Sequence, residues 1–190
     1  MGAKISRDRL LKEDFEFLKV NTHYTEDIII DWYRGFKKDC PDGKLNPDSF
    51  MKIYRQCFQK GNLIEFCDHV FRSFDTDRNG FIDFKEFLLT MDVTSSGTPE
   101  DKFSLFFSLF DVDGNGWIDQ EEMTNLMKCI QNMADLGKTK LELSESPEEK
   151  AQDIFKKMDM NSDGRMNKDE FIRACKVDQQ LLSVIKPPPT

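Results

Sequence analysis

The fold is decided by the segment Asp75-Thr76-Asp77-Arg78-Asn79-Gly80-Phe81-Ile82-Asp83-Phe84-Lys85-Glu86. It has side-chain oxygens at its first, third, fifth, ninth and twelfth positions, and a glycine at its sixth. A cation of the size of calcium takes about six to eight oxygen ligands. Side chains at alternate loop positions, the backbone carbonyl of the seventh residue and a closing glutamate can supply them. A glycine at the sixth position permits a sharp turn that a Cβ would strain. The segment therefore predicts a calcium loop with the ligands Asp75, Asp77, Asn79, Phe81 (through its carbonyl), Asp83 and Glu86.

The same spacing recurs along the chain. A glycine stands at the sixth loop position four times, at residues 43, 80, 116 and 164, and an apolar residue follows each glycine two positions later. A single helix-loop-helix unit cannot bury its own pairing segment, so units should couple in twos, Leu45 with Ile82 and Ile118 with Met166. We therefore predict an all-α fold of four EF-hand helix-loop-helix units arranged as two pairs, with short β-pairing between loops.

Two further loops carry a complete ligand pattern, which makes three predicted calcium sites. The ligand side chains of the segment 111–122 carry four charges, as those of 75–86 do, whereas those of 159–170 carry three. The expected ligands in 111–122 are Asp111, Asp113, Asn115, Trp117 (through its carbonyl), Asp119 and Glu122. Those in 159–170 are Asp159, Asn161, Asp163, Arg165 (through its carbonyl), Asn167 and Glu170.

The first unit departs from the pattern. Aligned on Gly43, its loop has Lys38 at the first position, Cys40 at the third and Ser49 at the twelfth. A cation replaces an anion, and the closing carboxylate is missing. We expect no calcium at this loop at physiological concentrations.

Capping residues and composition place the remaining boundaries. Thr25, Thr98 and Ser146 have acidic residues after them and should begin helices. A further helix is expected from Asp8 to about Asn21. The polar stretch 93–97 resembles a hinge. The predicted organisation is an N-terminal segment and helix (1–22), an N-terminal pair (23–93), a hinge (94–97), a C-terminal pair (98–176) and a tail (177–190).

Composition excludes several classes of function. The net charge of −8 argues against nucleic acid as a partner. No apolar run is long enough to span a membrane. The five cysteines are an odd number without CxxC spacing, which is typical of reduced, mostly buried thiols in the cytosol. No Ser-His-Asp, Cys-His or phosphate-loop arrangement is found, so an enzyme is not expected.

The N-terminus carries a lipidation pattern. The start Met1-Gly2-x-x-x-Ser6 matches the motif for a myristoyl group on Gly2. Four basic residues, Lys4, Arg7, Arg9 and Lys12, follow at once. One acyl chain gives only marginal membrane binding, and a basic cluster adds about 1 kcal/mol per charge near anionic lipid. We expect a cytoplasmic protein that is reversibly associated with membranes.

Several segments together resemble the neuronal calcium sensor family, closest to its recoverin, visinin-like, neurocalcin and hippocalcin group. They are the first loop with its Cys40-Pro41-x-Gly43 segment, Asp31-Trp32-Tyr33-x-Gly35-Phe36, His69-Val70-Phe71-Arg72-Ser73-Phe74-Asp75, and Asp111-x-Asp113-Gly114-Asn115-Gly116. The resemblance covers nearly the whole chain. It implies a calcium-myristoyl switch, in which calcium opens the N-terminal pair, extrudes the acyl chain and exposes an apolar groove for a target helix. The targets that it implies are receptor kinases, lipid kinases, cyclases or channels.

The residues themselves support an apolar groove in the N-terminal pair. This pair has more aromatic and aliphatic mass than one helix pair normally buries, although aromatic residues at helical spacing are also typical of a core. The candidates are Trp32, Phe36, Phe50, Ile53, Tyr54, Phe58, Phe84, Phe87, Leu88 and Met91.

Three functions remain open at this point. The first is a calcium sensor that binds a target protein, with a homodimer as a possible assembly. The second is a calcium buffer, which binds ions without opening. The third is a constitutive regulatory subunit like the calcineurin B chain, in which the first loop should be complete; here it is not.

Overall fold

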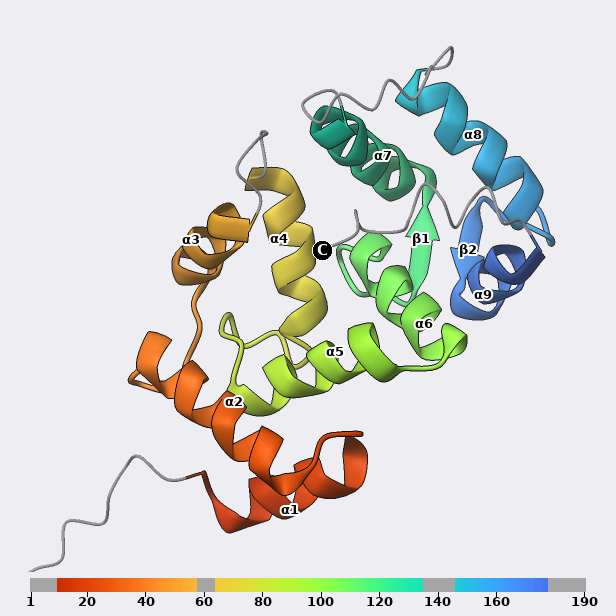
Figure 1. The fold of residues 1–190 in the computed structure, drawn as a ribbon. Coiled ribbons are helices and arrows are strands. Elements are labelled where there is room, and N and C mark those ends of the chain that lie inside the picture. The colour runs from red at the N-terminus through yellow and green to blue at the C-terminus, as the bar shows by residue number, and fades with distance from the viewer. Residues whose placement is uncertain (1–9, 58–63, 135–145, 178–190) are drawn as a thin grey trace, which may run out of the picture.

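The computed structural model describes residues 10–57, 64–134 and 146–177 (Figure 1). In this part the elements follow in the order α1 (Lys12–Asn21), α2 (Glu26–Asp39), α3 (Pro47–Cys57), α4 (Ile64–Phe74), α5 (Phe84–Ser96), α6 (Pro99–Phe110), β1 (Trp117–Asp119), α7 (Gln120–Ala134), α8 (Pro147–Met158), β2 (Arg165–Asn167) and α9 (Lys168–Val177). We call residues 38–49, 75–86, 111–122 and 159–170 loops 1 to 4. Each loop joins two helices, and the prediction of an all-α EF-hand fold is confirmed.

The loops pair as the sequence predicts. Between loops 1 and 2, the Leu45 and Ile82 N–H groups each donate to the carbonyl of the other residue at 2.9 Å. Between loops 3 and 4, β1 and β2 are antiparallel, with Ile118 opposite Met166. All four of these side chains are buried, so each pairing also extends a core. The structure thus has an N-terminal pair, α2 to α5, and a C-terminal pair, α6 to α9.

Each pair has its own core. The N-terminal core includes Leu18 from α1, which packs against the pair, together with Ile29 and Leu88. The C-terminal core is built around Phe110 and Phe171, whose ring centroids lie 5.5 Å apart. A fully buried side chain of this size contributes about 1.5–3 kcal/mol. These two cores hold the helices that flank the four loops.

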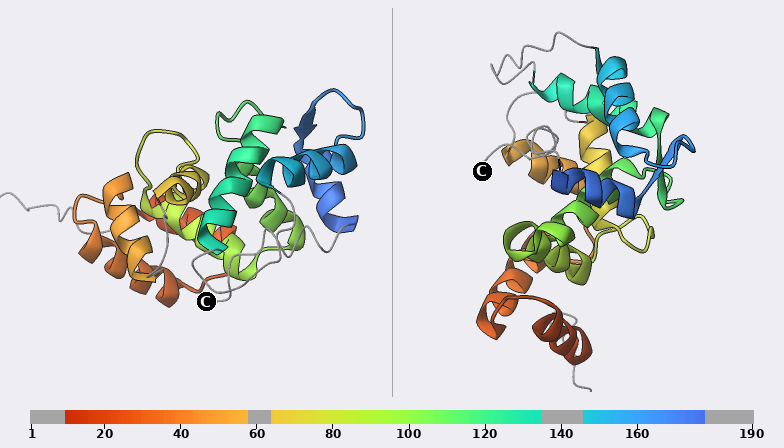
Figure 2. Two further views of the ribbon diagram at one scale, coloured as in Figure 1. Left: turned by 90° about the horizontal axis from the view of Figure 1, so that it is seen from above. Right: turned by 90° about the vertical axis from the view of Figure 1, so that its right-hand side faces the viewer.

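Helix α4 joins the two pairs. It contacts α3 and α5 of its own pair and also α6 and α7 of the C-terminal pair. Phe66 of α4 packs against the C-terminal core, and the His69 Nδ1 lies 3.1 Å from the Leu109 carbonyl oxygen. Figure 1 shows α4 between α3 and the C-terminal helices, and in both views of Figure 2 α2 lies toward one end of the molecule and α8 toward the other. The pairs are therefore in direct contact along α4.

The predicted helix caps are present. The Thr25 side chain accepts from the Ile28 N–H, and Ser146 accepts from the Glu149 N–H. At α6 the Thr98 hydroxyl oxygen accepts from the Asp101 N–H at 3.2 Å, and the Thr98 N–H donates to the Asp101 carboxylate at 3.0 Å. Hydrogen bonds from the Thr98 hydroxyl and N–H lower the pKa of the Asp101 carboxyl. Both ends of this capping box are satisfied, so α6 has a fixed start.

The predicted hinge at 94–97 needs correction. Helix α5 continues through Ser96, because the Thr94 and Ser95 hydroxyls donate back to the Met91 carbonyl instead of breaking the helix. The turn is confined to Gly97, whose N–H donates to Val93 O at 3.1 Å. A Cβ on Gly97 would lie 2.5 Å from that oxygen, so only glycine fits without a shift. Two residues, Gly97 and Thr98, thus connect α5 to α6. Helix α1 begins at Lys12, and residues 1–9 of the predicted first segment lie outside the described part.

The thiols agree with the sequence analysis. Cys40, Cys67, Cys129 and Cys175 are buried. Burial raises the pKa of the Cys175 thiol to about 12, so it is not a nucleophile at neutral pH. Among the described helices, none combines the length and apolar character needed to cross a bilayer.

We predict that Thr98→Ala lowers the free energy of unfolding by about 1 kcal/mol, because the capping oxygen at the start of α6 is lost. Urea unfolding followed by circular dichroism measures the change. Thr98→Ser keeps the oxygen and should stay close to the wild-type value. Equal stability of the alanine and wild-type proteins would contradict a role for this cap.

Candidate calcium-binding loops

Loop 2 is held together by its own predicted ligands. The Asp75 carboxylate accepts from the Asn79 N–H at 3.0 Å and from the Gly80 N–H at 2.9 Å. The Asp77 carboxylate accepts from the Asn79 N–H at 3.0 Å, and the Asn79 side-chain oxygen accepts from the Phe81 N–H at 2.9 Å. The positive φ of Gly80, 83°, turns the chain at this point. The backbone therefore wraps around the first three side-chain ligands.

Glu86 closes loop 2 from its far end. Its Oε1 accepts from the Thr76 N–H at 2.9 Å and from the Asp77 N–H at 3.2 Å, while its Oε2 accepts from the Asp83 N–H at 3.0 Å. In return, Asp83 accepts from the Glu86 N–H at 2.9 Å, which completes a capping box at the start of α5. The ninth and twelfth ligands thus also begin the exiting helix, a double role that the ligand spacing alone does not reveal.

Loop 3 repeats this arrangement. The Glu122 Oε1 accepts from the Val112 and Asp113 N–H groups at 2.8 and 3.2 Å, and its Oε2 accepts from the Asp119 N–H at 3.1 Å. Burial raises the pKa of the Glu122 carboxyl, the N–H donors lower it, and the charge of Asp119 raises it further. Desolvation is the largest of these effects, so this carboxylate is held where a cation would stabilise its charged form.

The side chains of loops 2 and 3 fit a calcium ion. Asp75, Asp77 and Glu86 each offer a carboxylate oxygen within 4.8 Å of the others, and Asp111, Asp113 and Glu122 do the same. In loop 3 the Asp111 Oδ1 is buried without a hydrogen-bond partner, while its Oδ2 accepts from the Gly116 N–H. A buried carboxylate oxygen without a partner is costly unless a cation approaches it. The remaining predicted ligands also belong to these two loops, Asn115 through its side chain and Phe81 and Trp117 through their carbonyls.

Loop 4 is less closed. The Asp159 carboxylate accepts from the Gly164 N–H at 2.9 Å, and Glu170 accepts from the Asn167 N–H at 3.0 Å, as in the other loops. Within the described residues, however, no hydrogen bond joins Glu170 to the first half of the loop, and Asp159, Asp163 and Glu170 form no three-carboxylate cluster. Asn161 replaces a carboxylate at the third position, which the sequence already shows. Arg165, the predicted carbonyl ligand, begins β2.

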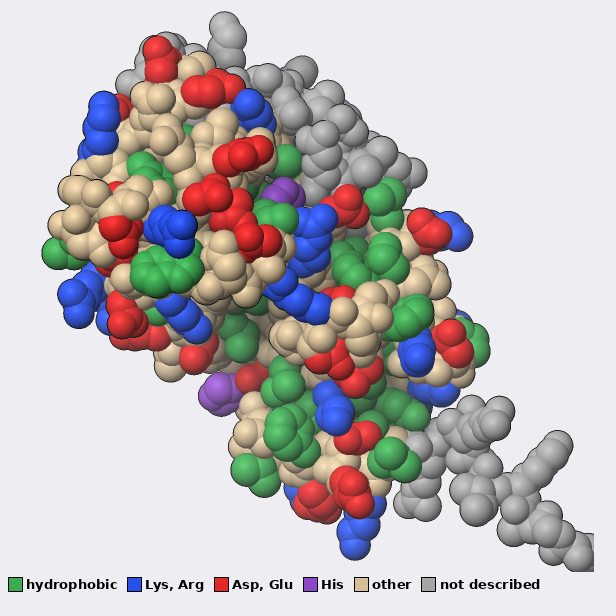
Figure 3. Space-filling model, turned by 180° about the vertical axis from the view of Figure 1, so that it is seen from behind, with side chains coloured by type: hydrophobic (Ala, Val, Ile, Leu, Met, Phe, Trp, Pro, Cys, Tyr) green, Lys and Arg blue, Asp and Glu red, His purple; other side chains and the backbone are tan. Residues whose placement is uncertain are grey.

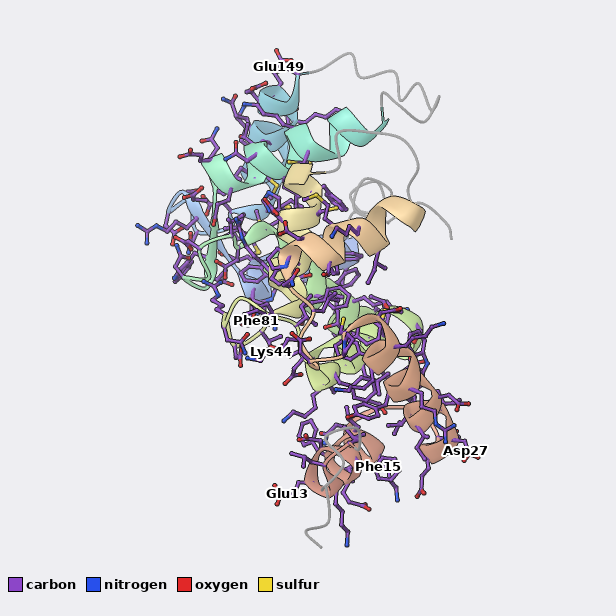
Figure 4. The ribbon with its side chains drawn as sticks, turned by 90° about the vertical axis from the view of Figure 1, so that its left-hand side faces the viewer. Glu13, Phe15, Asp27, Lys44, Phe81 and Glu149 are labelled. Atoms are coloured by element: carbon purple, nitrogen blue, oxygen red, sulfur yellow. The ribbon has the colours of Figure 1, made fainter. Side chains whose placement is uncertain are left out.

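Loop 1 keeps its pairing role without a ligand set. Cys40 is buried in the N-terminal core, and the Lys37 ammonium donates to the Pro41 carbonyl at 2.5 Å. Lys44 of loop 1 lies over the ring of Phe81 in loop 2, with its Nζ 4.7 Å from the ring centroid (Figure 4). The absence of calcium at this loop stays a prediction, and its contacts are those of a structural partner for loop 2.

The residues predicted for the target groove are divided between core and surface. Four are buried in the N-terminal core: Phe36, Phe50, Phe84 and Leu88. Phe87 and Met91 are half-buried, whereas Trp32 and Ile53 are 36% and 40% exposed. The side chain of Tyr54 and all of Phe58 lie outside the described part, as does Gly2. Four of the ten residues predicted for a groove are therefore part of the N-terminal core in this structure.

The fold and these loops define an EF-hand calcium-binding protein. A family model described as an EF-hand domain pair matches residues 100–176, and an EF hand domain model matches residues 66–93. The two matches contain loops 2, 3 and 4, and loop 1 lies outside both.

Comparison with curated relatives gives the family. Neuronal calcium sensor 1 of Lymnaea stagnalis is 41% identical over 97% of this chain and 96% of its own length, and that of Aplysia californica is 40% identical with the same coverage. Human recoverin is 35% identical over 93% of this chain and 90% of its own length. The chain belongs to the neuronal calcium sensor family, as its motifs predict, and it is accordingly a calcium sensor.

We predict that titration calorimetry finds three calcium sites in the wild-type protein. Glu86→Gln, Glu122→Gln and Glu170→Gln should each weaken one site by more than about tenfold, because even the loss of an outer partner of a metal ligand costs that much. Glu121→Gln changes the neighbouring exposed glutamate and is the matched control, with three unaltered sites expected. Unchanged binding in Glu86→Gln would refute the assignment of loop 2, and two sites in the wild type would remove loop 4 from the set.

Proposed function

We propose that this protein is a calcium-switched regulator that reaches membranes through a myristoyl group on Gly2 and binds a helix of a target protein on its N-terminal pair. One observation supports the proposal most directly: Glu86, the predicted closing ligand of loop 2, lies next to aromatic residues that extend from the core to the surface. Glu86 lies in the first turn of α5 between Phe84 and Phe87. A change in how Glu86 closes its loop would therefore act on the start of α5 and on both rings.

The aromatic contacts continue from α5 to the surface of α2. The Phe87 ring centroid lies 5.4 Å from that of Phe36 and 5.6 Å from that of Trp32. Phe84 lies 5.6 Å from Phe36 in the same group. Because Trp32 is already partly exposed, a rotation of α5 away from α2 would extend an existing apolar surface. A groove of this kind suits the apolar face of a target helix.

Calcium, when bound, supplies the positive charge that several converging carboxylates otherwise lack. The carboxylates of Asp75, Asp77 and Glu86 accept N–H bonds from their own loop in the present conformation. If Glu86 held an ion with both carboxylate oxygens, ligation would replace its hydrogen bonds to the Thr76 and Asp77 N–H groups. That exchange is the local event from which we expect α5 to move, with an affinity typical of sensors, about 10⁻⁷–10⁻⁵ M.

Helix α1, which follows the proposed acylation site in sequence, contacts α5. Lys85, next to Glu86, forms a 3.0 Å ion pair with Asp14 of α1, and this bond raises the pKa of the Lys85 ammonium. At the other end of α5, the Asp92 carboxylate accepts from the His23 N–H at 2.9 Å, just after α1. Figure 3 shows apolar side chains at the surface of the end formed by α1 and α2. Movement of α5 would thus change its contacts with α1, the helix that follows the proposed acylation site.

A calcium buffer is the rival function, and the burial of Phe36, Phe50, Phe84 and Leu88 favours it, because a buffer keeps such residues as core. A constitutive regulatory subunit is less suited, because loop 1 lacks a ligand set.

We predict that an apolar fluorescent dye binds the protein more strongly in calcium than in a chelator. The physical reason is exposure of the aromatic residues between α2 and α5. The Glu86→Gln protein should show a smaller rise, and Glu121→Gln should behave as the wild type. If calcium binds by calorimetry without any rise in dye fluorescence, the protein is a buffer.

We predict that the myristoylated protein sediments with vesicles containing anionic lipid only when calcium is present, and that Gly2→Ala abolishes this binding. The acyl chain is the main source of membrane affinity, and the basic N-terminus adds to it. Myristoylated Glu86→Gln is the control in which the acyl chain is kept and the switch is impaired. Vesicle binding retained by Gly2→Ala would show that the basic cluster suffices.

A further inference from the structure

Loops 2 and 3 touch each other through a side chain that is not a ligand. Arg78 is the fourth residue of loop 2, and its guanidinium donates a hydrogen bond to the carbonyl of Asp113 in loop 3. The guanidinium occupies the space beside Gly114, the fourth residue of loop 3. A Cβ built on Gly114 would lie 1.5 Å from the Arg78 Nη2, which is an impossible contact.

The fourth position of these loops has a backbone conformation that favours glycine. The fourth residue of loops 2, 3 and 4 is left-handed, with φ of 58° at Arg78, 67° at Gly114 and 57° at Ser162. A residue with a Cβ is strained in this conformation, and glycine is not. Loop 2 therefore has an arginine at a position where glycine would have less backbone strain. Loop 3 has a glycine at the position where the arginine side chain needs space.

Both ends of the contact belong to ligand turns. Arg78 stands between the ligands Asp77 and Asn79, and it donates to the carbonyl of the ligand Asp113. The N–H groups of Asp77 and Asp113 each donate to the closing glutamate of their own loop at 3.2 Å. A rearrangement of either closing glutamate thus reaches one end of the Arg78 contact through a single residue.

We propose that Arg78 is a positioning residue that couples the second and third calcium sites, so that an ion in one loop raises the affinity of the other. The inference rests on the proposed calcium response of these two loops. Coupling then passes directly from loop to loop, in addition to any effect through the packing of α4 on α6 and α7.

The first test is a mutant cycle read at loop 2. Phe81→Trp in a Trp32→Phe, Trp117→Phe background places the single tryptophan at the seventh position of loop 2, and Glu122→Gln disables loop 3. With Arg78 present, Glu122→Gln should weaken calcium binding at loop 2 about fivefold, a typical coupling between sites. With Arg78→Asn, which tolerates the left-handed backbone but is too short to reach loop 3, it should leave loop 2 unchanged. Ser162→Asn makes the matched replacement in loop 4 and should preserve the fivefold effect.

The second test needs no calcium. Gly114→Ala introduces a Cβ where the guanidinium lies, so it should destabilise the calcium-free protein more when Arg78 is present than in the Arg78→Asn protein. The backbone strain of alanine at position 114 is the same in both and cancels in the comparison. Equal losses of stability in chelator would show that the contact does not exist.

The outcomes separate the inference from the function on which it rests. If the tryptophan at position 81 gives no calcium response and calorimetry finds no ion in loop 2, the proposed function fails and the coupling fails with it. If both loops bind calcium but Glu122→Gln leaves loop 2 unaltered in the Arg78 protein, the coupling alone is wrong. A fivefold effect that persists in Arg78→Asn would assign the coupling to α4 instead.

Discussion

The hydrogen bonds that close loops 2 and 3 on their last residue are the constraint on which the rest of the structure depends. Through Glu86 and Glu122, one carboxylate joins the beginning of each loop to its end. In loop 2 the same carboxylate completes the capping box of α5. The ligand set, the start of the exiting helix and the aromatic residues of its first turn are therefore fixed together. Loop 4, where such closing bonds to the first half are not formed among the described residues, has a looser set of carboxylates.

Most of the local structure could be predicted from the sequence, because it depends on residues close together in the chain. The ligand positions follow from loop spacing, the caps at Thr25, Thr98 and Ser146 from single hydroxyl residues, and the pairing of Ile118 with Met166 from the eighth loop position. The hinge was predicted wrongly because a polar, hydroxyl-rich stretch is ambiguous. Its side chains can bond back to helix carbonyls as well as to solvent, and in this chain they do so.

Long-range contacts could not be predicted from the sequence. Neither the packing of Phe66 on the C-terminal core nor the contact of Arg78 with Asp113 leaves a pattern in the chain, since each depends on how two complete pairs meet. The division of the aromatic residues has the same origin. Periodicity places Trp32 and Phe36 on one helix at the spacing of neighbours, but only tertiary packing leaves the first exposed and the second buried. The candidate loops could thus be predicted from the sequence, whereas the contact between loops 2 and 3 came only from the structure.

Loop 1 has a consequence for the shape of the calcium response. It contributes the Leu45 pairing and the contact of Lys44 with Phe81, but no set of ligand side chains. The N-terminal pair therefore offers one complete ligand set, and a single site titrates with no steepness of its own. A steep calcium dependence in the N-terminal pair would require coupling to the C-terminal sites. The contacts of α4 and loop 2 with the C-terminal pair are where such coupling would act. If loop 1 binds no calcium, as its sequence predicts, the steepness of a calcium response in the N-terminal pair would depend on the contacts between the pairs rather than on the interior of either pair.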